Sequence, residues 1–125
     1  MIYGEDTRVD VFEAPAPLAE RARRSIFAMI PANRVNERNP NNVTLNAGTL
    51  SESFGVCSDQ RFANQVTAAS CSATLIDDDL LVTAGHCIGS LRECQSQRFV
   101  LGYQMEADGL APLTSAQVFS CQSLV

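Results

Sequence analysis

The segment CSATLIDDDLLVTAGHC, residues 71–87, decides the fold that the sequence predicts. It contains two short runs rich in β-forming residues, 71–76 and 80–85. Three consecutive aspartates, residues 77–79, join these runs and suit a tight polar connection, so we expect a β-hairpin. We expect a solvated turn here and no calcium site, because calcium loops alternate their acidic residues and place a glycine at the bend.

Runs elsewhere in the chain predict further strands. Residues 25–30 form a short apolar run that ends at Pro31, and residues 98–105 and 116–121 have similar character. Residues 43–45 could form another short strand. Repeated short strands with irregular connections are typical of an all-β barrel or sandwich.

The domain division follows from the remaining segments. Residues 1–24 read as an N-terminal arm that breaks at APAP and continues as a possible short helix. Residues 31–42 are rich in asparagine and predict a surface loop, and residues 55–69 predict a mixed loop. Residues 25–125 are long enough for one β-barrel domain.

Composition excludes two classes of function. The chain is 46% hydrophobic and 18% charged, as globular proteins are, and its apolar stretches are too short to span a membrane. The formal net charge of -5 opposes binding to nucleic acid, because phosphate contacts need a clustered positive surface. We therefore expect neither a nucleic-acid partner nor a membrane partner.

The chain has five cysteines, and no two of them have CxxC spacing. This usage favours disulfides over a metal or redox centre, and we expect no metal and no cofactor. Disulfides imply an oxidising compartment, so we expect a secreted or periplasmic protein. Residues 1–20 have no signal-peptide pattern and the cysteine count is odd, which indicates a mature or truncated chain.

The single histidine, His86, completes the most informative pattern. Residues 71–87 resemble the histidine segment of trypsin-like serine proteases, in which a cysteine, an S-G-T-L-I type strand, a polar turn, an apolar strand and T-A-[AG]-H-C follow at the same spacing. The resemblance implies two six-stranded β-barrels with the active site between them, and this chain would be the first barrel. It also implies that His86 is the general base, that Ala84 and Gly85 form the turn that presents it, and that Cys71 pairs with Cys87.

The start of the chain adds to this resemblance. IYGEDTR, residues 2–8, is similar to the V-I-G-x-D-D-R opening of mature bacterial glutamyl-endopeptidase-like members. Ile2 is then the candidate mature amino terminus.

The sequence departs from the family pattern after the histidine. It contains no D-[IY]-A-L type strand for the aspartate and no G-D-S-G-G-P type motif for the serine. Asp108, in EADG, lacks the apolar strand context and is not assigned this role. We therefore expect the N-terminal barrel of a serine endopeptidase, truncated before both motifs and inactive alone, with protein or peptide substrates and a missing C-terminal barrel as partners.

Two alternatives stay open. The chain could be a non-catalytic protease-like binding module that keeps the barrel, or a small disulfide-bonded β-domain with a chance histidine motif. For the remaining cysteines, a bridge between Cys94 and Cys121 is preferred because these residues flank two predicted strands, and Cys57 is left over.

Overall fold

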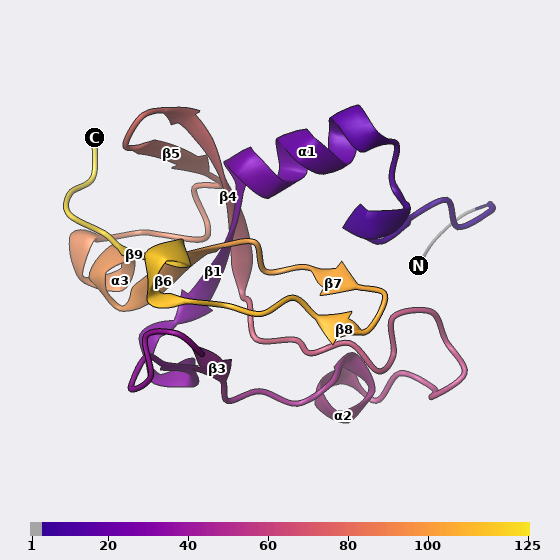
Figure 1. The fold of residues 1–125 in the computed structure, drawn as a ribbon. Coiled ribbons are helices and arrows are strands. Elements are labelled where there is room, and N and C mark those ends of the chain that lie inside the picture. Colours follow the sequence, from indigo (N-terminus) through magenta and orange to yellow (C-terminus); the bar gives the residue numbers. More distant parts are fainter. Residues whose placement is uncertain (1–3) are drawn as a thin grey trace.

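The structure is a computed structural model that describes residues 4–125, so Ile2 lies outside the described residues. Its main feature is an antiparallel five-stranded sheet with the order β5-β4-β1-β6-β9 (Figure 1). The strands are β1 (Ile26–Pro31), β4 (Cys71–Asp77), β5 (Leu80–Thr83), β6 (Gln97–Leu101) and β9 (Val118–Ser120).

Shorter elements surround this sheet. Two small antiparallel pairs, β2 with β3 and β7 with β8, lie beside it. The shorter elements are α1 (Ala16–Ser25), α2 (Leu50–Phe54), α3 (Leu91–Gln95), β2 (Val35–Asn36), β3 (Thr44–Leu45), β7 (Met105–Glu106), β8 (Gly109–Leu110), and 3-10 turns η1 (Val11–Glu13), η2 (Ala32–Arg34) and η3 (Ser115–Gln117).

Strand β1 is the centre of the sheet and is buried on both faces. Phe27 and Met29 point to one face and Ala28 and Ile30 to the other, because successive side chains of a strand alternate. Each face has its own apolar cluster. This explains why residues 26–30 are an uninterrupted apolar run.

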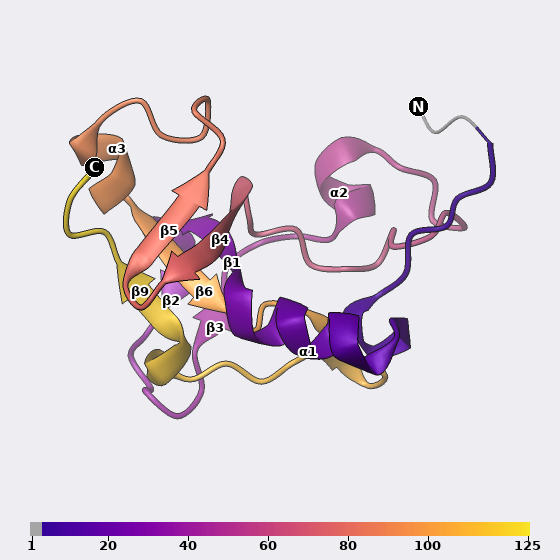
Figure 2. The ribbon, with the colours of Figure 1, turned by 90° about the horizontal axis from the view of Figure 1, so that it is seen from above.

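The sheet curls as an open half-barrel (Figure 2). Strands β5 and β9 form its two edges, and within residues 4–125 no strand pairs with the outer side of either. The chain is thus mostly β and antiparallel, as the sequence predicts, with backbone hydrogen-bonding groups free along both edges.

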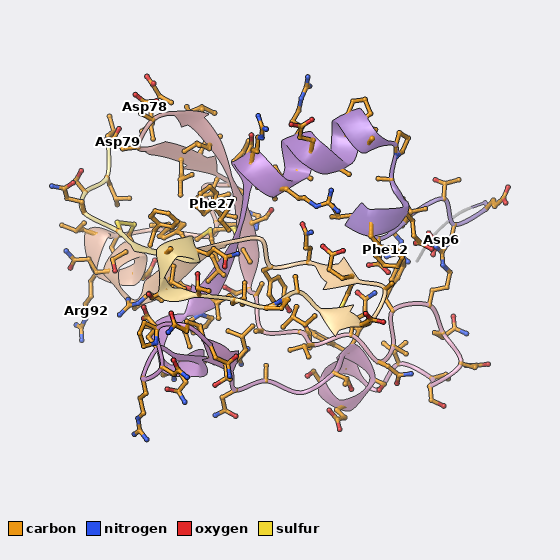
Figure 3. All side chains as sticks on the ribbon, in the orientation of Figure 1. Asp6, Phe12, Phe27, Asp78, Asp79 and Arg92 are labelled. Atoms are coloured by element: carbon orange, nitrogen blue, oxygen red, sulfur yellow. A yellow bond between two sulfur atoms is a disulfide. The ribbon has the colours of Figure 1, made fainter. Side chains whose placement is uncertain are left out.

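The predicted hairpin is confirmed as β4 and β5. Its register shifts between Leu75 and Asp77, where the strand has an irregularity. The side chains of Asp78 and Asp79 point outward at its tip (Figure 3), and residues 77–79 are exposed, as a solvated turn requires.

Three predicted segments need correction. Residues 116–121, predicted as a strand, begin in η3, and β9 covers only Val118–Ser120. Residues 31–42, predicted as a loop, contain η2 and β2. Residues 98–105 were expected to be one strand, but β6 ends at Leu101 because Gly102 adopts a φ of 77° that strands do not use. The sequence pattern predicts neither α2 nor α3. Each helix has only five residues, which is too short to show the helical repeat of apolar residues.

The N-terminal arm contains the predicted short helix, α1. Side-chain contacts attach the residues that precede this helix to the rest of the protein. The Arg61 guanidinium donates to the backbone oxygens of Asp6, at 2.9 Å, and of Arg8. The Arg8 guanidinium hydrogen-bonds both carboxylate oxygens of Asp6 at 2.9 Å and lowers the pKa of that carboxyl to about 2. Both guanidiniums also lie over the Phe62 ring.

Candidate functional site around His86

His86 lies on a tight turn that directly follows the edge strand β5. The Cys87 amide donates to the Ala84 carbonyl at 2.9 Å and closes this turn. The imidazole is exposed and is not part of either apolar cluster. The turn therefore presents a nitrogen ligand or base to the surroundings and does not bury it.

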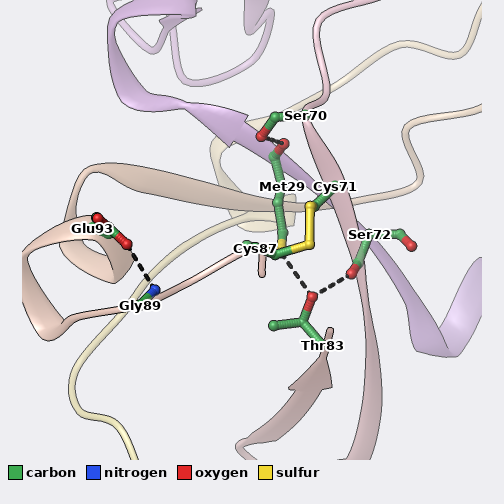
Figure 4. Close-up of a disulfide and its surroundings, with 8 residues drawn as sticks. All are labelled: Met29, Ser70, Cys71, Ser72, Thr83, Cys87, Gly89 and Glu93. Carbon is green, nitrogen blue, oxygen red and sulfur yellow. Dashed lines mark hydrogen bonds between the residues drawn. A yellow bond between two sulfur atoms is a disulfide. The ribbon is translucent and has the colours of Figure 1, made fainter. Parts of the chain in front are cut away.

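A disulfide joins this turn to the neighbouring strand. Cys87 is bonded to Cys71 at the start of β4, with the two Cα atoms 6.2 Å apart (Figure 4). This is the pairing that the resemblance implies. It fixes the residue next to His86 against the start of β4, so the turn cannot move away from the sheet without distorting the strand.

A hydroxyl group fixes the other end of the turn. The Thr83 hydroxyl donates to the Ser72 carbonyl at 2.7 Å and lies 3.3 Å from the Met29 sulfur (Figure 4). Met29 is fully buried at the centre of the sheet. The strand end before His86 is thus attached to β4 and the core.

The second disulfide lies on the same side of the sheet. Cys94 of α3 is bonded to Cys121, which follows β9, with a Cα–Cα distance of 5.6 Å. This is the pairing preferred from the sequence. Cys57 is exposed and forms no disulfide.

The two sulfurs beside His86 raise the question of a metal site. One ligand atom each of Cys71, His86 and Cys87 lie within 4.8 Å of one another. The sulfurs are bonded to each other, however, and metal binding needs deprotonated thiolates. The arrangement in this oxidised state offers an imidazole beside a disulfide, and it does not offer a set of three ligands.

Within residues 4–125, no side chain hydrogen-bonds the His86 ring in the structure. Asp108, the aspartate that follows His86 in the sequence, lies in the turn between β7 and β8, at the opposite end of the molecule from α3 (Figure 1). The structure therefore does not bring Asp108 to the imidazole, and the sequence pattern likewise assigns Asp108 no catalytic role. A carboxylate partner for the ring would have to come from another segment.

Comparison of the chain with protein-family models, with curated proteins and with solved structures finds no match. Among the described residues, no helix has the length and apolar character needed to cross a membrane. The two disulfides are compatible with a secreted or periplasmic location, because such bonds persist in oxidising compartments.

Proposed function

We propose that this chain supplies the histidine-bearing barrel of a secreted or periplasmic, trypsin-like serine endopeptidase. One observation carries the proposal: an exposed imidazole, His86, stands on a turn that the Cys71–Cys87 disulfide holds against the sheet. A general base must be accessible to the reacting hydroxyl and fixed in position, and this turn satisfies both needs.

His86 would act twice in each reaction. It would take the proton of a serine hydroxyl as the oxygen attacks the peptide carbonyl, and then give that proton to the leaving amine. Free imidazole suits this exchange because it gains and loses its proton near neutral pH. The serine, the aspartate that orients the ring and the oxyanion donors would come from outside the described residues, from a second barrel and the strand that precedes it.

The open sheet supports this assignment. Strand β5 leads directly into the His86 turn, and its outer edge is unpaired within residues 4–125. The edge of β9 is unpaired as well. A strand between these two edges would satisfy the free backbone groups of both, close the barrel and pass beside the imidazole, where the orienting aspartate is needed.

A non-catalytic binding module is the second candidate. It is favoured by the absence, within residues 4–125, of a hydrogen-bond partner for the His86 ring. Such a module would keep the disulfide-bonded hairpin for stability and would use the surface of the domain for recognition. It would need neither a serine nor an aspartate beside the His86 ring.

Labelling with a fluorophosphonate probe distinguishes these candidates. The polypeptide encoded by the complete gene should be labelled at a serine, and His86→Ala should abolish the labelling because the serine loses its base. Asp108→Asn is the matched control and should label like the wild type. The 125-residue chain alone should stay unlabelled.

Two results would reject the proposal. If the complete gene product is folded and unlabelled, the binding module becomes the better description. If it is labelled and His86→Ala is labelled equally well, His86 is not the base.

A further inference from the structure

We infer that Glu93 is a positioning residue for His86. The catalytic meaning of this inference rests on the proposed function, whereas its structural content does not. The Glu93 carboxylate binds the segment that leaves the His86 turn and attaches it to α3.

The contact is a short charge-assisted hydrogen bond. The Gly89 amide donates to Glu93 Oε2 at 2.7 Å (Figure 4). The Glu93 amide in turn donates to the hydroxyl of Ser90, the N-cap residue of α3, at 3.2 Å. Hydrogen bonds to an ionised acceptor are roughly twice as strong as neutral ones.

This contact differs from an ordinary helix cap. In α2 the equivalent residue, Glu52, accepts from the amide of the N-cap residue Thr49, also at 2.7 Å. Glu93 instead reaches one residue further back, past Ser90 to Gly89. Its carboxylate therefore contacts the connection to the histidine turn, whereas its backbone amide takes part in the cap of α3.

Residue 89 is suited to this close approach because it has no side chain. A Cβ at this position would lie 3.2 Å from Glu93 Oε2, which is tighter than ordinary van der Waals contact. Glycine thus leaves room for the carboxylate above the backbone amide.

Glu93 has a rigid support. The next residue, Cys94, is only 3% exposed, belongs to the apolar cluster of Phe27 and Met29, and is bonded to Cys121. The hydrogen bond therefore connects the histidine turn to a fixed part of the core. Upstream, Thr83 makes the corresponding attachment to β4.

The sole histidine of the chain makes the inference testable by NMR, because its imidazole resonances need no assignment against others. Glu93→Ala should broaden or shift the His86 imidazole resonances. It should also raise the hydrogen-exchange rate of the Gly89 amide by about tenfold or more, the effect expected from losing a hydrogen bond to a charged group.

Two variants separate positioning from general stability. Glu93→Gln keeps an acceptor oxygen and should restore the His86 resonances and most of the Gly89 protection. Glu52→Ala removes the matched contact in α2 and should leave both readouts as in the wild type.

Gly89→Ala tests the same contact without removing the carboxylate, and it keeps the inference falsifiable if Glu93→Ala fails to fold. It should shift the carboxylate by a few tenths of an ångström and perturb the His86 resonances less than Glu93→Ala does. The inference fails if Glu93→Ala or Gly89→Ala leaves these resonances unchanged, or if Glu93→Gln perturbs them as much as Glu93→Ala.

None of these measurements requires protease activity, so their failure is distinguishable from failure of the proposed function. In the complete gene product, Glu93→Ala should lower kcat and leave KM nearly unchanged, because a displaced base affects the chemical step more than binding. Glu93→Gln should restore kcat.

Discussion

Removal of the Cys71–Cys87 disulfide by the double substitution Cys71→Ala and Cys87→Ala tests how the histidine turn is held. The bridge spans 16 residues of sequence. Closing a loop of this size in the unfolded chain is worth about 3 kcal/mol in the chain-entropy model. We therefore expect the free energy of unfolding to fall by about 3 kcal/mol.

Packing adds to this value. Both cysteines pack against the apolar cluster that contains Met29 and Phe99, and both are half-buried. Loss of the two sulfur contacts should contribute about 1 kcal/mol more, by the free energy of burying apolar surface. The expected total is about 3 to 4 kcal/mol, a large share of the 5–15 kcal/mol that is typical of a domain.

Urea unfolding followed by circular dichroism measures this change. The reference protein should carry Cys57→Ser, since the exposed free thiol can exchange with the disulfides. Removal of Cys94–Cys121 is the matched comparison. That bridge spans 27 residues, so the same model gives about 3.5 kcal/mol before any packing loss at the buried Cys94.

The two disulfides should also differ in how strongly their removal affects the surroundings of His86. The His86 imidazole resonances should lose their folded shifts when Cys71–Cys87 is removed, and should change less when Cys94–Cys121 is removed. A loss of stability below about 1 kcal/mol together with unchanged His86 resonances would show that noncovalent contacts alone hold the turn, and would refute the reasoning.

Three further predictions concern other parts of the structure. Gly102→Ala should destabilise the protein by about 1 to 2 kcal/mol in urea unfolding, because φ is 77° there and a Cβ would lie 2.7 Å from the Gln117 amide nitrogen; a neutral result would contradict the strained conformation. Met29→Ala should cost about 2 to 5 kcal/mol by the same measurement, because the side chain is fully buried, and a cost near zero would show that the core collapses around the gap. Arg8 lowers the pKa of Asp6 from 3.8 to about 2, so the stability that this ion pair gives the arm is present above pH 4 and is lost as pH falls towards 2. The amide exchange rate of residues 4–10 should therefore rise as pH falls across that interval, and Asp6→Asn should remove this pH dependence.

Local sequence determined the hairpin and the identity of the candidate base. The alternation of short β-forming runs around residues 77–79 is enough to predict β4 and β5, because strand propensity and turn chemistry act between near neighbours. The pattern around His86 indicated a turn fixed by flanking cysteines, and the structure has that turn and that bridge.

The role of Glu93 was missed, although its signal is present in the sequence. Ser90 and Glu93 have the S-x-x-E spacing of a helix N-terminus, as Thr49 and Glu52 have T-x-x-E. The spacing predicts a cap for a short helix. The spacing does not predict that the Glu52 carboxylate accepts from the amide of its N-cap residue, whereas the Glu93 carboxylate accepts from Gly89, the residue before its N-cap.

The sequence by itself predicted the β4–β5 hairpin and the disulfide-bonded turn that carries His86, because these depend on contacts between residues close along the chain. It did not predict the short strands β2, β7 and β8. Only the tertiary structure decided that β1 is the central strand, that β5 and β9 are free edges within residues 4–125, and that Glu93 of α3 accepts a hydrogen bond from Gly89. The physical reason is that strand order and burial come from pairing between distant segments, whose free energies are set by the whole packed core and are not encoded in any short window of residues.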